Sequence, residues 1–178
     1  PCNPTGGVIS EDAMKKLAQL AVRHDLFVIS DEVYRHILFD GIAYHTIAAE
    51  PGMQERTLIV DNCSKTFAMT GFRIGFGTGP VHLIELMTKL TEGMYSNAVT
   101  FSQRGAIAAF RESLGQCGEM CREYQRRRDY VVSRLNNMPG IHCILPKGAF
   151  YVFANISGTG LSAEDFANRL LDQQHVAV

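Results

Sequence analysis

The sequence predicts an α/β protein: a mostly parallel sheet covered by helices, followed by a smaller α+β domain. Up to residue 112, short apolar runs of strand length alternate with helical stretches. The pattern changes at residues 111–120 (RESLGQCGEM), where two glycines interrupt helical sequence. Beyond this point, two apolar runs on either side of a Pro-Lys-Gly turn predict an antiparallel pair. We therefore expect a domain at residues 1–115 and a second at residues 116–178.

The first predicted element is an amphipathic helix that ends near His24. Ser10 is of the residue type that caps helix N-termini. Apolar side chains then recur at helical spacing, at Met14, Leu17, Ala18 and Ala21.

The sheet is predicted from three further segments. Residues 26–30 (LFVIS) and 57–60 (TLIV) have the length and composition of buried strands. Residues 73–80 (RIGFGTGP) predict a third strand whose alternating glycines leave one face open to a close neighbour. Helices are expected at residues 81–94 and 101–112.

The second domain is expected to begin with a long helix from Glu119. Its predicted apolar stripe comprises Met120, Tyr124, Val131 and Leu135, and the run 126–128 (RRR) is expected on its solvated side. Strands are predicted at residues 141–145 and 149–156. Ser162 is expected to cap a last helix, and residues 176–178 to begin another strand.

The amino-acid composition excludes several classes of binding partner. Seventeen Lys and Arg against eighteen Asp and Glu give a net charge of -1, which provides no positive field for nucleic acid or an anionic membrane. Five scattered cysteines without a CxxC pair argue against a disulfide framework or a metal site, although Cys117 and Cys121 share a helical face. No apolar run is long enough to span a membrane. A small-molecule partner and a reducing cytoplasm are therefore expected.

Polar residues follow the two predicted parallel strands directly. Asp31 and Tyr34 follow the first, and Ser64 and Lys65 follow the second. Ligands of open parallel sheets bind at these carboxyl ends, so the side chains are expected to share one crevice. A lysine in such a site can condense with an aldehyde, an arginine such as Arg73 suits a phosphate, and a carboxylate can hold a ring nitrogen protonated. Together these groups describe pyridoxal phosphate (PLP).

Three motifs closely resemble the class I/II aminotransferases, the fold-type-I enzymes that depend on PLP. They are NPTGG at residues 3–7, SDEVY at 30–34 and SKTFAMTGFRIGF at 64–76. Their order and spacing also match, with Asp31 lying 28 residues after Asn3 and Arg73 lying 8 residues after Lys65. The resemblance continues through PKGAFYVFANI. It implies that residues 1–115 are part of the large PLP-binding domain and that residues 116–178 are part of the small C-terminal domain.

The resemblance assigns roles to Lys65 and Asp31 in the reaction. Lys65 would bind the cofactor as an internal aldimine and then move a proton between the substrate α-carbon and the cofactor as general base and acid. Asp31 would pair with the pyridinium nitrogen, and that charge makes the ring an electron sink.

It also assigns the remaining cofactor contacts. Tyr34 and Asn3 would donate hydrogen bonds to the phenolic oxygen of the ring and lower the aldimine pKa. Arg73 and Ser64 would hold the phosphate. The substrates would be an amino acid and a 2-oxo acid, and the enzyme would be a homodimer.

Each assignment has a simpler alternative. Lys65 could be an ordinary surface lysine, and Arg73 could form a structural ion pair. Asp31 could merely cap the segment after its strand, in which case adjacent Glu32 would pair with the ring nitrogen. Tyr34 could be a core tyrosine, and Asn3 could be a turn residue. The motif spacing selects Asp31 over Glu32.

The sequence departs from the family pattern in several places. Asn62 stands where many members have a small hydroxyl residue that helps bind phosphate. The family's phosphate loop, its ring-stacking aromatic residue and its carboxylate-binding arginine are absent. We therefore expect a piece of a longer protein, truncated at both ends. Alone, this piece is expected to be inactive, to bind cofactor weakly and to associate with itself or with other chains.

Three functions remain open from the sequence. The first is an aminotransferase. The second is a β-lyase or related elimination enzyme, because the same carbanion can expel a leaving group. The third, from another class, is a non-catalytic assembly module that keeps the fold.

Overall fold

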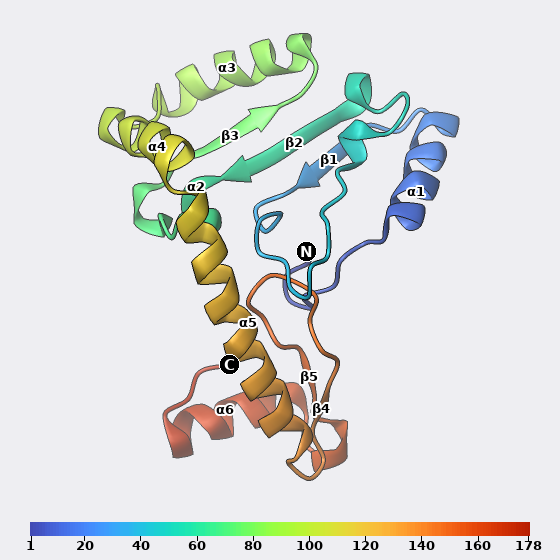
Figure 1. The fold of residues 1–178 in the computed structure, drawn as a ribbon, viewed down its shortest axis with the longest axis vertical. Helices are drawn as coiled ribbons and strands as arrows, with labels where there is room; N and C mark the ends of the chain where they lie inside the picture. The colour runs from blue at the N-terminus through green and yellow to red at the C-terminus, as the bar shows by residue number, and fades with distance from the viewer.

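A computed structural model describes all residues, 1–178, and its first part is an α/β layer built on a three-stranded sheet (Figure 1). The strands β1 (Val28–Asp31), β2 (Thr57–Asn62) and β3 (Gly75–Thr78) lie in the order β1-β2-β3. β1 and β2 are parallel, with Val28 opposite Thr57, whereas β3 runs antiparallel to β2. The three predicted strands are thus all present.

The helix α1 (Glu11–Arg23) forms where the sequence predicts it. The Ser10 hydroxyl accepts a hydrogen bond from the Ala13 amide, so the N-terminus of the helix is capped. Met14, Ala18 and Ala21 are buried and pack with Ile47 and Met53. These two residues belong to the segment 47–56, which contains the short 3-10 helices η1 (Ile47–Ala49) and η2 (Gln54–Arg56).

The helices α3 (Val81–Tyr95) and α4 (Thr100–Glu112) follow β3, as predicted. Figure 1 shows α3 running alongside β3. A side chain at Gly77 would lie 3.4 Å from the Met87 methyl group of α3, so the glycine lets this helix approach the strand closely.

The sheet is less covered than the sequence predicts. Both parallel strands were expected to be fully buried, but the Ile29 side chain is 68% exposed and Val60 is 37% exposed. The apolar residues form three small buried clusters instead of one core. The prediction of buried strands is therefore wrong for one side of β1, because no helix of this chain packs against it.

The long helix α5 (Leu114–Asn136) begins five residues earlier than predicted. Gly115 and Gly118 lie inside it, so the expectation that they interrupt the helix is wrong. A glycine in a helix interior costs only about 1 kcal/mol, which tertiary packing can outweigh. Here the thiols of Cys117 and Cys121 both donate to the backbone carbonyl of His36, which holds this part of the helix in place.

The face of α5 that is buried also differs from the predicted stripe. Arg128, expected on the solvated side, is only 6% exposed. Its guanidinium binds both carboxylate oxygens of Asp40 at 2.7 and 2.9 Å and lies 4.8 Å above the Phe39 ring. The prediction fails because a bidentate ion pair satisfies the charge and the stem packs on an aromatic ring.

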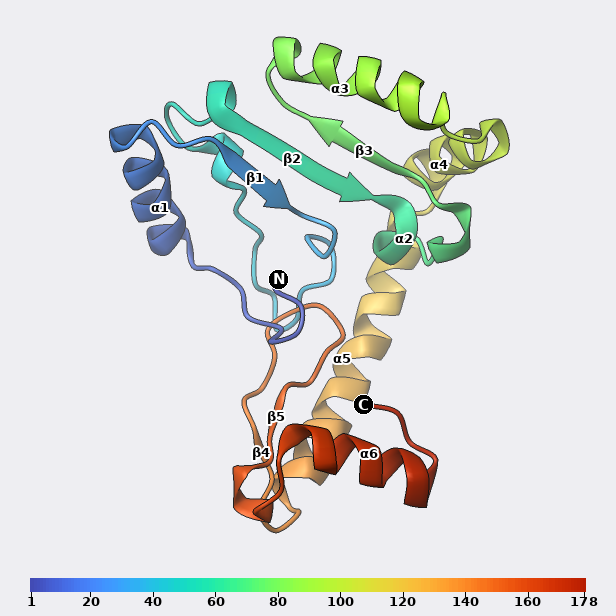
Figure 2. The same ribbon diagram turned by 180° about the vertical axis from the view of Figure 1, so that it is seen from behind.

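The C-terminal part is an α+β arrangement at the far end of α5 (Figure 2). β4 (His142–Cys143) pairs antiparallel with β5 (Ala154–Asn155), but both strands are much shorter than predicted. Ser162 caps the last helix, α6 (Ala163–Gln174), by accepting from the Asp165 amide. Residues 176–178 form no strand, contrary to prediction, because no neighbouring strand pairs with them. None of the helices combines the length and apolar character needed to cross a membrane.

Candidate active site

The candidate site lies at the carboxyl edge of the parallel strand pair. Asp31 is the last residue of β1, and the Glu32 amide donates to the Val60 carbonyl of β2 at 2.9 Å. β2 ends at Asn62, and the four-residue helix α2 (Cys63–Thr66) follows it at once. Because the two strands are parallel, the polar residues that follow them emerge at the same edge of the sheet.

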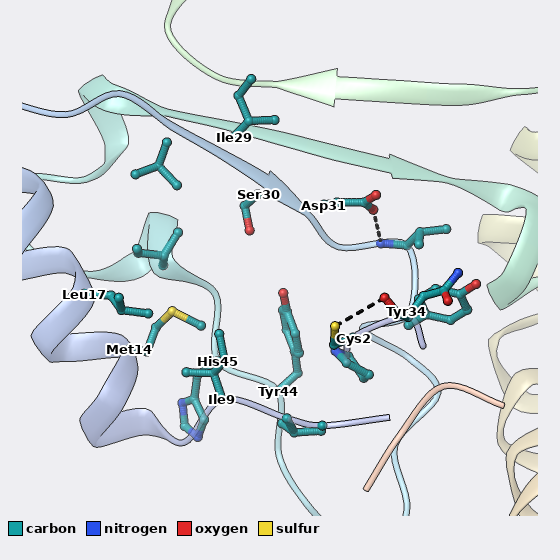
Figure 3. A pocket seen from close by; sticks show the side chains of 17 residues that line it. Cys2, Ile9, Met14, Leu17, Ile29, Ser30, Asp31, Tyr34, Tyr44 and His45 are labelled. Atoms are coloured by element: carbon teal, nitrogen blue, oxygen red, sulfur yellow. Dashed lines mark hydrogen bonds between the residues drawn. The ribbon is translucent and has the colours of Figure 1, made fainter. Parts of the chain in front are cut away.

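A cavity of about 460 Å³ opens beside the end of β1 (Figure 3). Asn3, Asp31 and Tyr34, three of the predicted site residues, line it. Ser30, Tyr44 and His45 add polar groups, and apolar side chains close the other side, among them Ile9, Met14, Leu17, Val28, Ile29 and Ile47. In Figure 3 the Tyr44 hydroxyl points toward Ser30.

Asp31 is exposed, and its carboxylate accepts a hydrogen bond from the Val33 amide at 3.2 Å. Glu32, its competitor by sequence, is only 1% exposed and points into the protein. Glu32 accepts from Ser30 at 3.1 Å and from Thr46 at 2.5 Å, and its second oxygen has no hydrogen-bond partner. These contacts commit Glu32 to the interior and leave Asp31 as the carboxylate that faces the cavity.

Tyr34 is almost fully buried, and its hydroxyl lies 2.5 Å from the hydroxyl of Tyr151. Its ring makes edge contacts with Phe150 and Tyr151, at centroid distances of 5.4 and 5.6 Å. Burial raises the pKa of the Tyr34 phenol above its ordinary value, and the hydrogen bond with Tyr151 raises it further. Tyr34 therefore stays protonated and can act as a hydrogen-bond donor.

Lys65 lies on α2, whose first turn is fixed by the residue before it. The Asn62 side chain accepts from the Ser64 amide at 2.9 Å and thereby caps this short helix. The half-buried Lys65 amine lies 5.5 Å from the centroid of the Phe150 ring. Ser64 is buried beside it.

Arg73 lies just beyond the 3-10 turn η3 (Thr70–Phe72), which packs against α2. It is exposed, adopts the left-handed conformation with φ 50°, and donates to the Thr70 carbonyl at 3.0 Å. The Ser102 hydroxyl of α4 binds the Phe72 carbonyl at 2.7 Å and holds this turn in place.

The predicted residues thus form two groups. Asn3, Asp31 and Tyr34 line the cavity, whereas Ser64, Lys65 and Arg73 lie outside its lining on α2 and the adjoining turn. Phe150 connects the groups, because its ring contacts both the Lys65 amine and the Tyr34 ring.

Phe150 and Tyr151 were not among the predicted site residues. They come from the C-terminal part of the chain, where the sequence predicts a strand at residues 149–156. The only available signal was that two aromatic residues directly follow a Pro-Lys-Gly-Ala turn, which does not indicate what they contact.

The charged side chains of Lys65, Asp31 and Arg73 form no ion pair within the protein. The ion pairs of the structure involve neither Lys65 nor Asp31 nor Arg73. The nearby Arg35, by contrast, binds Asp61 at 3.0 Å. An amine, a carboxylate and a guanidinium thus remain free to bind a ligand that carries an electrophilic carbon, a basic nitrogen and an anionic group.

Comparison with known proteins identifies the family to which the chain belongs. The sequence matches the family described as aminotransferase class I and II over residues 1–178. It is 46% identical to an aspartate aminotransferase of Pyrococcus abyssi and 43% identical to aromatic-amino-acid aminotransferase 2 of Thermococcus litoralis. Each alignment covers 100% of this chain and 46% of the relative, so the chain spans about half the length of the curated relatives it matches.

Solved structures give the same result. The fold superposes on the crystal structure of an aromatic aminotransferase from Pyrococcus horikoshii with a TM-score of 0.95, 44% identity and coverage of 100% of this chain and 48% of the other. An aspartate aminotransferase from Rhizobium meliloti gives a TM-score of 0.94 at 36% identity, with the same coverage. These matches confirm the predicted α/β fold class.

Proposed function

Because the chain belongs to the class I and II aminotransferase family, whose members depend on PLP, we propose that it supplies the lysine-bearing part of an aminotransferase. The reaction would transfer an amino group between an amino acid and a 2-oxo acid. Relatives named as aspartate and aromatic-amino-acid aminotransferases support this reaction type. The chain spans 45–46% of those relatives, so the activity is proposed for a longer protein that contains it, called the parent protein below.

One observation carries the proposal: Lys65, Asp31 and Arg73 are unpaired charges on segments that meet at the carboxyl edge of β1 and β2. This donor set fits PLP, which offers an aldehyde, a pyridine nitrogen and a phosphate. When bound, the cofactor supplies the aldehyde that takes up amino groups and the ring that accepts electrons from the substrate α-carbon.

Each side chain of the site would then have a separate role. Lys65 would bind the aldehyde carbon and move a proton at the substrate α-carbon. Its half-buried position would limit the access of water that competes for this proton. Asp31 would keep the ring nitrogen protonated. Tyr34 and Asn3 would donate to the phenolic oxygen, and Tyr34 can do so because its raised pKa keeps it protonated. Arg73 and Ser64 would bind the phosphate.

The proposal extends to the organisation of the parent protein. Residues 1–115 would belong to the large PLP-binding domain and residues 116–178 to the small C-terminal domain. The parent protein would act as a homodimer in the cytoplasm.

The test uses the purified parent protein with PLP, a panel of amino acids and a 2-oxo acid. We expect the 2-oxo acid of the donor to appear together with the amino acid made from the acceptor. We also expect an absorption band of the bound cofactor that the Lys65→Ala variant lacks. The matched control is Lys89→Ala, because Lys89 lies exposed on α3, away from the site.

Two outcomes would contradict the proposal. Release of ammonia with no new amino acid would indicate an elimination enzyme. A Lys65→Ala protein that keeps both the band and the turnover would show that this lysine does not carry the reaction.

A further inference from the structure

The segment 146–149 ties the C-terminal part of the chain to the candidate site. The amides of Lys147 and Gly148 both donate to the Gly6 carbonyl, at 2.9 and 3.1 Å. On its other side, the Phe39 amide donates to the Lys147 carbonyl at 3.0 Å, and the Ala149 amide donates to the Ile37 carbonyl at 2.9 Å. Four backbone hydrogen bonds therefore fix where the next two residues lie.

Those two residues are Phe150 and Tyr151, and each contacts a proposed site residue. Phe150 lies beneath the Lys65 amine, and Tyr151 shares a 2.5 Å hydrogen bond with Tyr34. Tyr151 is the only hydrogen-bond partner of the Tyr34 hydroxyl in the structure. The orientation of that hydroxyl is therefore governed by a residue 117 positions away in the chain.

Two hydroxyl groups that share one hydrogen bond have two possible arrangements. If Tyr34 donates to Tyr151, Tyr34 presents only lone pairs toward the site and repels an anionic ligand oxygen. If Tyr151 donates to Tyr34, the Tyr34 proton is free to bind that oxygen. Tyr34 becomes the stronger donor in this second arrangement, because hydrogen bonds in a chain polarise one another.

We propose that Tyr151 is a positioning residue that donates its hydroxyl proton to Tyr34, so that Tyr34 donates its own proton to the phenolic oxygen of the bound cofactor. This inference rests on the proposed function. It adds a residue from the C-terminal part of the chain to the cofactor site.

The experiment compares Tyr34→Phe, Tyr151→Phe and the double variant of the parent protein by their affinity for PLP, measured on the apoprotein. We expect Tyr34→Phe to weaken binding by about tenfold or more, the effect of losing one hydrogen bond to a charged group. Tyr151→Phe should weaken binding by less, because it removes a hydrogen bond between two neutral hydroxyls. The double variant is expected to bind no more weakly than Tyr34→Phe alone, because Tyr151 acts only through Tyr34.

The absorption band of the bound cofactor gives a second readout. A donor to an anionic ring oxygen favours the deprotonated form of the bound cofactor. Tyr151→Phe should therefore move the pH midpoint of the band upward, by up to about one pH unit, the shift that a tenfold effect would give. Tyr130→Phe is the matched control, since Tyr130 is 64% exposed on α5 and should change neither affinity nor midpoint.

A double-mutant cycle on stability distinguishes a positioning role of Tyr151 from a merely structural one. The same variants are unfolded without cofactor, and the coupling between Tyr34 and Tyr151 is measured from the unfolding equilibria. Coupling in both stability and PLP binding supports the proposal. The proposal is overturned if the two residues are coupled in stability but have additive effects on PLP binding. It is also overturned if the pH midpoint of the absorption band is unchanged in Tyr151→Phe. If the wild-type band survives in Lys65→Ala, the proposed function itself has failed.

Discussion

At the scale of single residues, Gly148 lies where two distant parts of the chain approach each other closely. A Cβ atom at this position would lie 2.6 Å from the Pro1 ring and 2.7 Å from the Ile37 carbonyl oxygen. The second atom belongs to the backbone and cannot rotate away. Only glycine lets the 146–149 segment reach the position from which Phe150 and Tyr151 contact the site.

We therefore predict that Gly148→Ala lowers the free energy of unfolding by about 1–3 kcal/mol, the usual cost of overpacking. Chemical denaturation followed by circular dichroism measures it. The control is Gly71→Ala, where an added Cβ would meet no heavy atom within 4 Å. A Gly148→Ala protein as stable as this control would show that the junction is looser than the structure indicates.

The ion pair between Arg128 and Asp40 gives a pH dependence with a defined sign. The hydrogen bonds from Arg128 hold the pKa of Asp40 below its ordinary value of 3.8. A lowered carboxylate pKa stabilises the fold fully above the unfolded pKa, and this contribution is lost as the pH falls through the folded pKa. We predict that stability falls below about pH 4 and falls less steeply in Asp40→Asn.

The measurement is the free energy of unfolding as a function of pH at low and at high salt. The Asp40 side chain is 45% exposed, so salt should screen part of the effect. Asp172→Asn, which removes an exposed carboxylate without an ion-pair partner, should keep the wild-type slope. An unchanged slope in Asp40→Asn would contradict the assignment.

The residues of the site were predictable to different degrees. Lys65 and Asp31 could be selected because they follow predicted strands, and parallel strands end at one edge of a sheet. Their roles in the reaction remain predictions. Tyr151 could not be selected, because its contact with Tyr34 depends on a junction between segments more than a hundred residues apart. Arg128 was misplaced for a similar reason, since its partner Asp40 is 88 positions away.

At the scale of elements, α5 shows how packing overrides local preference. The glycines at 115 and 118 predicted a break, yet the helix runs through both. An added Cβ would meet nothing within 4 Å at Gly115, and only the tip of the Arg122 side chain, at 3.9 Å, at Gly118. The glycines are therefore not required by crowding, and they only weaken the helix.

We predict that Gly115→Ala and Gly118→Ala each raise the free energy of unfolding by about 0.5–1 kcal/mol, because alanine loses less backbone freedom on folding. Chemical denaturation again gives the value. Gly160→Ala serves as the opposite control, since its φ of 75° strains any other residue, and it should be destabilising. If the helix began only at Glu119, neither substitution would increase stability.

The elements that the sequence predicted well are those with local signals. The helix α1 combines a capping serine with apolar residues at helical spacing, and α6 has the same combination. The strands β4 and β5 were predicted too long, because apolar residues such as Ile144 and Phe153 suggested pairing that the structure does not make. Both side chains are instead exposed, at 81% and 62%.

At the scale of the whole molecule, the accessible surface is larger than that of a compact domain. A folded monomer of 19.7 kDa is expected to expose about 8,600 Å². This chain exposes 11,900 Å². The excess of about 3,300 Å² is comparable to the area that a large obligate interface buries. Much of the exposed area is apolar, as on α3, where Val81, Leu90 and Met94 are each at least 65% exposed.

We therefore predict that the 178-residue chain on its own associates with itself. Burying apolar surface of this extent against another copy of the chain lowers the free energy and so favours association. Sedimentation velocity should show a weight-average mass that rises with concentration, and a dye that binds apolar surface should fluoresce strongly with the chain.

Leu90→Glu places a charge on the exposed face of α3 and should reduce both signals while leaving the helix content unchanged. Gln173→Glu adds the same charge on α6 and should reduce them less, because that position is already polar. A chain that remains monomeric over the whole concentration range without binding the dye would show that these apolar side chains are covered in solution.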